Sequence, residues 1–187
     1  MIKSARIVTE ACSPWVTNLI FFSALGWGTH QLIPGAIAGV VTGPGVMAGI
    51  GVMMRLGLIG DHHVTKGHER GYAFAWIGVC LAAVLALFAL TGVNRGLWGA
   101  FFTSTIFIGI YTALIKLGLK SSIHVGLWVA CCIYLAFALS PWWLVALLLA
   151  PLIAWSRVTL HEHSVKEVSV GAGIGAVLGI VASVIIF

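Results

Sequence analysis

Charged residues are scarce in this chain. Asp, Glu, Lys and Arg make up 8% of its 187 residues, against roughly 25% in soluble domains, while hydrophobic residues make up 60% and the mean hydropathy is +1.09. So few polar side chains cannot cover the surface of a soluble domain of this length, which excludes a water-soluble enzyme or binding module. The composition predicts an integral membrane protein.

Other absences narrow the function. The ten Lys and Arg residues are scattered, without a basic run interleaved with aromatic residues, so the net charge of +5 does not indicate a nucleic-acid partner. The four cysteines form no C-x-x-C pair, and three of them lie inside apolar runs, which favours small buried side chains over redox or metal chemistry. Residues 1–14 lack the apolar core and the cleavage site of a removable signal peptide, so the first apolar segment is expected to be retained.

Apolar runs recur along the whole chain. At roughly 20 residues per helical span, they predict an all-α polytopic transmembrane bundle of six or seven spans with short loops, forming one domain over residues 1–187. Residues 1–58 are expected to form an N-terminal helical hairpin, in which Gly43-Pro44-Gly45 predicts a strong kink or a re-entrant segment. The runs cover residues 15–32, 35–58, 72–90, 97–117, 123–139, 142–155 and 168–187.

Three polar segments interrupt the apolar runs, at residues 60–71, 116–124 and 156–167. Two spans separate each polar segment from the next, so all three are expected at one membrane face. Six of the seven histidines belong to these segments, and every Lys and Arg except Arg95 lies there, at the N-terminus or at the end of the second run. The positive-inside rule then predicts that the polar face is cytoplasmic. We expect the protein in the cell (inner) membrane.

The residue types in these segments suit phosphoryl transfer. Arginine offers a fixed fork of donors for phosphate, and histidine serves as a nucleophile or as a general acid near neutral pH. A carboxylate beside a histidine fixes its tautomer and ring orientation. The acidic ligand set that magnesium needs is missing, so the positive charge around a phosphate is expected to come from Arg70, Arg157 and lysines.

The third polar segment carries the most specific pattern. Ser156-Arg157, five residues, His163, three residues and Glu167 resemble the signature S-R-x5-H-x3-D of the phosphatidic acid phosphatase type 2 superfamily, membrane lipid phosphatases related to vanadium haloperoxidases. Ser121-Ser122-Ile123-His124 resembles a degenerate form of its P-S-G-H signature. The order of the motifs and their shared membrane face also match the family, over a signature-bearing core of about residues 59–187.

The first polar segment resembles the remaining signature of the family, K-x6-R-P. Arg70 stands in the arginine place, while His63 stands where lysine is expected and Lys66 follows three residues later. Gly71 replaces the proline, and in the third segment Glu167 replaces aspartate. These departures concern the expected phosphate-binding residues and the choice of substrate, and they leave the expected nucleophile unchanged.

The resemblance implies a mechanism. His163 attacks phosphorus to form a phosphohistidine, Glu167 orients the His163 ring, and His124 protonates the leaving oxygen and then activates water. It implies a lipid phosphate or isoprenyl (di)phosphate that reaches the site from the surrounding membrane lipids, without metal or other cofactor. The phosphate-binding residues would be Arg157, Arg70, Lys66, His63 and Ser122.

Simpler roles exist for several of these residues. Ser164-x-x-Glu167 fits a helix capping box, as does Thr159-x-x-Glu162, so Glu167 could cap a helix, orient His163, or do both. His161 and Glu162 are interpreted as bystanders in an exposed loop. The remaining polar side chains could lie among lipid headgroups, and these are His62, His63, His68, Lys66 and Lys120.

Two other functions stay open. A non-catalytic protein that binds or transports lipid phosphates could tolerate the degenerate first and second motifs. A histidine-box metal enzyme would explain the histidines at one face, but it requires H-x3-4-H boxes together with H-x2-3-H-H boxes, a combination that the sequence lacks.

Overall fold

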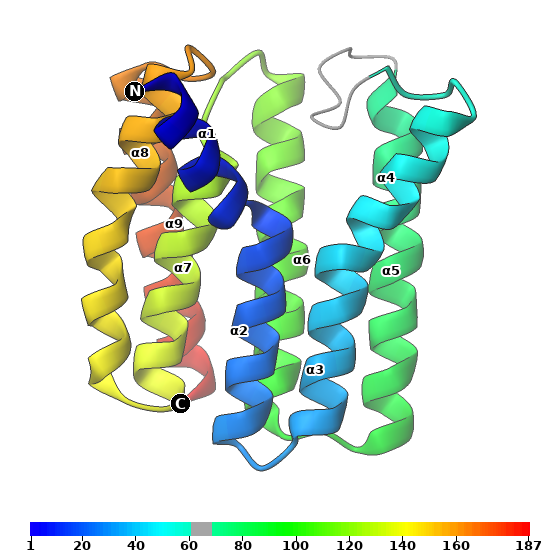
Figure 1. Ribbon diagram of the computed structural model, residues 1–187. Helices are drawn as coiled ribbons and strands as arrows, with labels where there is room; N and C mark the ends of the chain where they lie inside the picture. Colours follow the sequence, from blue (N-terminus) through cyan, green and yellow to red (C-terminus); the bar gives the residue numbers. More distant parts are fainter. Residues whose placement is uncertain (61–68) are drawn as a thin grey trace. The chain divides into compact units, whose positions relative to one another are not determined.

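The computed structural model describes residues 1–60 and 69–187, and this part of the chain is helical throughout, without strands (Figure 1). The prediction of an all-α membrane protein is confirmed by five helices that are long and apolar enough to cross a bilayer. The five are Leu32–Arg55, Gly71–Thr91, Arg95–Lys116, Pro141–Thr159 and Val165–Ile186.

The helices follow the apolar runs of the sequence closely. Two of the five candidate spans are composites, because a π-helical turn (η1) joins α3 to α4 and a 3-10 helix (η3) leads into α8. In chain order the elements are α1 (Ile2–Ala11), α2 (Pro14–Gly28), α3 (Leu32–Val40), η1 (Val41–Gly45), α4 (Val46–Arg55), α5 (Arg70–Thr91), α6 (Arg95–Lys116), α7 (Ile123–Ala138), η3 (Pro141–Leu149), α8 (Ala150–Thr159) and α9 (Val165–Ile186).

The described chain divides into two compact units. The first comprises residues 1–17 and 94–187, and the second comprises residues 18–93. The second and third polar segments belong to the first unit, whereas the first polar segment belongs to the second. The single domain expected for residues 1–187, and its signature-bearing core from about residue 59, stay predictions.

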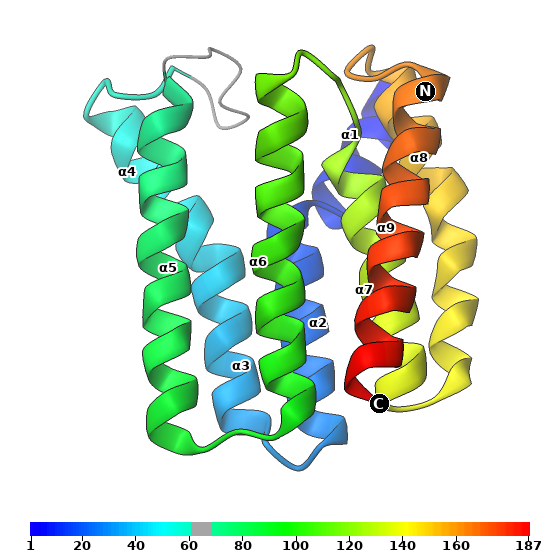
Figure 2. The same cartoon turned by 180° about the vertical axis from the view of Figure 1, so that it is seen from behind.

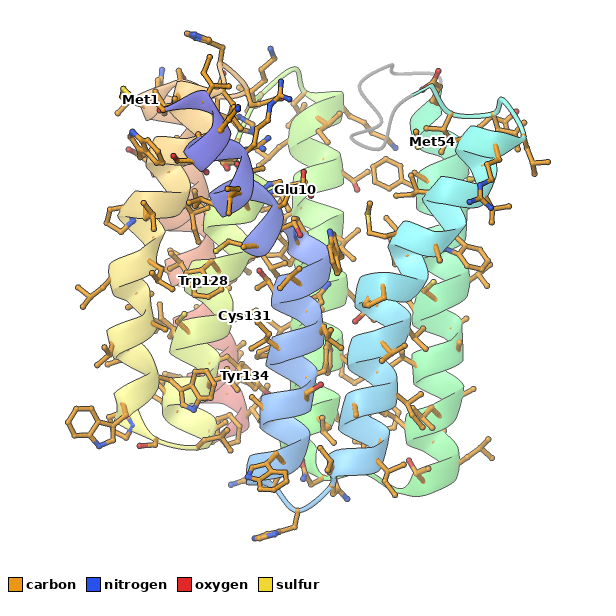
Figure 3. The ribbon with its side chains drawn as sticks, in the orientation of Figure 1. Met1, Glu10, Met54, Trp128, Cys131 and Tyr134 are labelled. Carbon is orange, nitrogen blue, oxygen red and sulfur yellow. The ribbon has the colours of Figure 1, made fainter. Side chains whose placement is uncertain are left out.

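Helix α7 is the centre of the first unit. Eleven of its residues are buried, and two of its polar side chains are bonded to neighbouring elements. The Trp128 indole donates to the Ala146 carbonyl of η3 at 2.9 Å, and the Tyr134 hydroxyl donates to the Gly96 carbonyl of α6 at 2.7 Å. Trp128 and Tyr134 are labelled along α7 in Figure 3. These bonds fix α7 between η3 and α6.

Helix α9 packs on α7 through small residues (Figure 2). Gly171, Gly175 and Gly179 recur every four residues and therefore lie on one face of α9. A Cβ atom at Gly171 would lie 2.5 Å from the Ser122 carbonyl oxygen, and one at Gly175 would overlap the main chain of Gly126. The two backbones are therefore in direct contact.

Helix α1 was not anticipated as a separate element. Ala5 and Thr9, four residues apart, form its buried face and pack against α8. Ser156 donates its hydroxyl proton to the Ile153 carbonyl at 2.7 Å, so Thr9 is the donor in the 2.9 Å contact between the Thr9 and Ser156 hydroxyls. The N-terminus is thereby attached to the turn of α8 that carries Arg157.

In the second unit the chain stays helical through Pro44. Proline has no amide proton to donate, and the helix accommodates it with the π-helical turn η1, beyond which α4 is inclined to α3 in Figure 1. The Trp76 indole donates to the Gly45 carbonyl at 3.1 Å. Of the two expectations for this region, a distorted helix is correct and a re-entrant turn is wrong.

Candidate phosphoryl-transfer site

The third polar segment forms the end of α8, a short turn and the start of α9. Arg157 lies in the last turn of α8, where a positive charge is favourable next to the carbonyl end of the helix. The amides of Glu162 and His163 both donate to the Arg157 carbonyl, at 3.1 and 3.3 Å. This closes the turn so that His163 returns toward Arg157, although five residues lie between them.

The His163 ring is held by Glu167. Nδ1 of His163 lies 3.1 Å from Oε2 of Glu167, four residues later, and both side chains are half-buried. The same Oε2 atom accepts the Ser164 amide at 3.0 Å, and the Glu167 amide donates to the Ser164 hydroxyl at 3.3 Å, which completes a capping box for α9. Glu167 therefore caps the helix and contacts His163 with one carboxylate oxygen.

The second capping box suggested by the sequence is wrong. Thr159 is the last residue of α8 and cannot begin a helix, so Thr159-x-x-Glu162 has no capping role. Glu162 was interpreted as a bystander, but its Oε2 lies 3.8 Å from Nη2 of Arg157. His161 is exposed as expected, and it adopts the left-handed φ of +57°.

Arg157 is a buried cation with incomplete hydrogen bonding. The residue is only 4% exposed, and its Nε and Nη1 atoms have no hydrogen-bond partner among the residues that the structure describes. Glu162 and, more weakly, Glu10 act on it through their negative charges. Because an unpaired buried donor is energetically costly, such a guanidinium is suited to an oxyanion ligand.

The second polar segment lies directly beside the third. The Ser122 amide donates to the Glu167 carbonyl at 3.2 Å, and the Tyr111 hydroxyl donates to the Ser122 carbonyl at 3.2 Å. In Figures 1 and 2 the link from α6 to α7, the turn from α8 to α9 and the start of α1 lie at the same end of this unit. The shared face predicted for these two segments thus holds within the first unit.

Two further candidate residues lie on this link. Ser122 precedes α7, and its hydroxyl is fully buried without a hydrogen-bond partner in the described ranges 1–60 and 69–187. His124 lies in the first turn of α7 and is half-buried. The Ser122 hydroxyl, like the Arg157 guanidinium, is therefore a buried polar group that could still form a hydrogen bond with a ligand.

His163 is set to be neutral at pH 7. Burial lowers the pKa of His163 below its usual value of 6.5, and the positive charge of Arg157 lowers it further, against the raising effect of the Glu167 hydrogen bond and charge. A neutral imidazole carries one N–H proton. The Glu167 carboxylate faces Nδ1 and accepts a hydrogen bond there, so the proton resides on Nδ1. Nε2 is then left with a lone pair, as a nucleophile requires.

The first polar segment is described only in part. His63 and Lys66 lie outside the described residues, and Arg70 begins α5 in the second unit, with its side chain outside the description. Glu69, which no motif singles out, is 5% exposed, and its Oε2 accepts a hydrogen bond from the Gly60 amide at 2.9 Å. The structure therefore brings the second and third segments together and leaves the role of the first as a prediction.

The described residues include no cluster of three or more His, Cys, Asp and Glu side chains arranged to hold a metal ion. Comparisons with models of known protein families, with characterised proteins and with solved structures find no significant match to this chain. The resemblance to the phosphatase superfamily therefore rests on the motifs, and the function that it implies is a proposal.

Proposed function

We propose that this protein is a membrane phosphatase that hydrolyses a lipid phosphate or an isoprenyl (di)phosphate through a phosphohistidine, without a metal ion. One observation carries the proposal. His163, held by Glu167 at 3.1 Å, lies on the same closed turn as the buried guanidinium of Arg157, which has donors without partners in the described chain. A nucleophile and an oxyanion-binding cation are thus supplied by one turn.

The chemistry follows from the two ends of the His163 ring. Nε2 attacks phosphorus and forms an N–P bond, while the bond from phosphorus to the leaving oxygen breaks. The leaving oxygen is the lipid oxygen of a monophosphate or the bridging oxygen of a diphosphate. His124 gives its proton to the leaving oxygen and then takes one from the water that attacks phosphorus. The N–P bond breaks as the water oxygen bonds to phosphorus, which frees His163 and releases phosphate. Glu167 accepts the Nδ1 proton in a hydrogen bond throughout and stabilises the charge that forms on the ring.

Arg157 would stabilise the charge on the phosphoryl oxygens. A guanidinium donates two parallel hydrogen bonds to a phosphate, and this bond pair is strongest where water is excluded. Ser122, with its buried hydroxyl, would add a neutral donor to the phosphate. Arg70, with Lys66 or His63, would complete the pocket from the first polar segment.

The membrane arrangement supports a lipid substrate. Counted with the five long helices, the shorter α2 and α7 would make seven spans. All three polar segments would then lie at one face, which would be cytoplasmic by the positive-inside rule. Helix α7 has 16 residues, so it rises about 24 Å, less than the roughly 30 Å of a bilayer core. With thin loops and a short α7, the site would lie at headgroup depth, where an amphiphile presents its phosphate.

The decisive experiment measures phosphate release by the detergent-purified full chain in the presence of a chelator. The substrates are an isoprenyl diphosphate, phosphatidic acid and phosphatidylglycerophosphate. We expect turnover of at least one substrate, its loss in His163→Ala, and an acid-labile phosphoprotein with ³²P-labelled substrate. His161→Ala is the matched control, because this histidine is exposed and lies only two residues away.

The outcomes separate the competing functions. Turnover that is unchanged in His163→Ala would refute the proposal. Binding of a lipid phosphate without product or phosphohistidine would indicate the non-catalytic protein instead. Activity that requires stoichiometric iron or zinc and is abolished by the chelator would indicate the metal enzyme.

A further inference from the structure

The pair formed by Arg157 and Glu162 is unequal. The Arg157 side chain is 5% exposed and fixed within the end of α8, whereas the Glu162 side chain is 41% exposed and lies on the turn that follows. The closest atoms are 3.8 Å apart, which exceeds the usual length of a charge-assisted hydrogen bond, about 2.7–2.9 Å. The cation is therefore fixed, and its carboxylate partner is held loosely.

The backbone of the turn brings Glu162 to this position. The left-handed conformation of His161 reverses the chain after α8, and the Glu162 amide then donates to the carbonyl of Arg157 itself. The main chain of Glu162 is thus anchored to the residue that its side chain contacts. The carboxylate can leave the guanidinium by side-chain rotation, without a change in the turn.

The guanidinium also retains donors that Glu162 does not use. Nε and Nη1 of Arg157 have no hydrogen-bond partner in the part of the chain that is described, and Glu162 approaches only Nη2. A carboxylate that satisfied this arginine would engage two nitrogens in parallel. The contact with Glu162 therefore satisfies the guanidinium only in part.

We propose that Glu162 is an exchangeable counter-ion of Arg157, which occupies the guanidinium until a phosphate group binds and displaces it. This inference rests on the proposed function, because it assigns Arg157 to the phosphate. Glu162 neutralises a buried charge in the resting protein and competes with the ligand for it. Glu10, whose charge acts on Arg157 more weakly, is a second and smaller competitor.

Competition between Glu162 and phosphate for Arg157 predicts the direction in which phosphate affinity changes when Glu162 is replaced. Replacing Glu162 by glutamine removes the competing charge and keeps the size of the side chain, so phosphate should bind more tightly, by about two- to fivefold for a partly exposed ion pair. A residue that merely supports the turn, or that donates to the ligand, would weaken binding when replaced. Glu162 is exposed, so the substitution should leave the fold intact.

The test is a titration of the detergent-purified full chain with inorganic phosphate. Binding is measured as the increase in the unfolding temperature with phosphate concentration. We expect Glu162→Gln to bind phosphate more tightly than the wild type, Glu10→Gln to show a smaller change in the same direction, and Arg157→Met to lose binding. Methionine fills the buried space of the arginine stem and carries no charge. A loss of binding in this variant therefore reports the loss of the guanidinium rather than a packing defect.

The results distinguish this inference from the proposed function. Equal or weaker phosphate binding by Glu162→Gln, with binding still dependent on Arg157, overturns the counter-ion role and leaves the phosphatase proposal standing. Tighter binding by Glu162→Gln in a protein that hydrolyses no lipid phosphate supports the counter-ion role and refutes the phosphatase. If no variant shows binding that depends on Arg157, both fail.

Discussion

The amide of Ser122 donates a hydrogen bond to the carbonyl oxygen of Glu167, 3.2 Å away. This main-chain contact joins the second polar segment to the third, because Ser122 precedes α7 and Glu167 lies in the first turn of α9. The proposed proton donor, His124, and the ring of His163 are each only a few residues from it. The glycine at 171 allows the contact, since any side chain there would meet the Ser122 main chain.

Gly171→Ala should destabilise the protein and reduce phosphate release. A Cβ atom at this position would lie 2.5 Å from the Ser122 carbonyl oxygen, which is main chain and cannot rotate away. Overpacking of this kind costs about 1–3 kcal/mol. Thermal unfolding of the detergent-purified protein measures the loss.

Gly173→Ala is the control on the same helix. A Cβ atom at Gly173 meets no atom within 4 Å, so the substitution should be neutral or should stabilise α9 by up to about 1 kcal/mol. Equal unfolding temperatures for the Gly171→Ala and Gly173→Ala proteins would contradict the close packing of α9 on α7.

Ser164→Ala should separate the two roles of Glu167. Loss of the Ser164 hydroxyl removes the acceptor of the Glu167 amide and costs about 1 kcal/mol of stability. The contact between Glu167 and the His163 ring does not involve that hydroxyl, so the turnover of folded protein should stay near the wild-type value. Glu167→Ala should lower the turnover as well, by roughly 10- to 100-fold, as expected when the group that orients a reacting side chain is lost. Similar turnover in the two variants would show that Glu167 acts only as a cap.

The acid limb of kcat/KM for phosphate release should lie below pH 6.5. Only the neutral His163 ring can attack phosphorus, and burial, assisted by the charge of Arg157, lowers the pKa of His163 below the usual 6.5.

Glu167 opposes this shift, so Glu167→Gln should lower the His163 pKa further, which an NMR titration of labelled histidines would detect. A rise of the His163 pKa in this variant would contradict the assignment.

The same shift predicts how stability depends on pH. The folded protein binds the His163 proton less tightly than the unfolded chain, whose histidines titrate at about 6.5. The contribution of His163 to stability is therefore present above this pH and decreases as the pH falls through it. The difference in unfolding free energy between wild type and His163→Gln, measured at pH 8 and at pH 5.5, should become smaller or reverse at the lower pH.

His161→Gly should be tolerated and should stabilise the turn. The φ of +57° at His161 is a conformation that glycine adopts without strain, whereas other residues pay about 1 kcal/mol or more. His161→Val should be destabilising for the same reason, because β-branched side chains are poorly accommodated at positive φ. If the glycine variant unfolds at a lower temperature than the valine variant, the conformation assigned to this turn is wrong.

Much of the fold was predictable from apolar runs and breakers. The Ser140-Pro141 break separates α7 from η3, and Ser140 accepts the Trp142 amide at the start of η3. The short helix α1 was missed because its pattern is only ten residues long and its buried face consists of Ala5 and Thr9. Small and weakly polar side chains give no hydrophobic signal, although they pack closely.

The candidate site was predictable in its residue types and only partly in its geometry. The pairing of His163 with Glu167 was expected from the motif. His163 lies in the turn just before the N-cap of α9, so the contact depends on how that turn enters the helix and not on helical spacing alone. The contact of Glu162 with Arg157 depends on the left-handed backbone of His161, which nothing in the residue pattern indicates. The burial of Arg157 arises from packing at the end of α8, beyond the reach of motif spacing.

The glycines of α9 have a mechanical consequence. Where two helices touch through main-chain atoms, there are no side chains between them that can change rotamer to accommodate sliding or rolling, and intermediate positions bring atoms into collision. The α7–α9 pair should therefore behave as one stiff body during a reaction cycle. Any opening that admits a bulky lipid or releases its product has to be made by other parts of the chain.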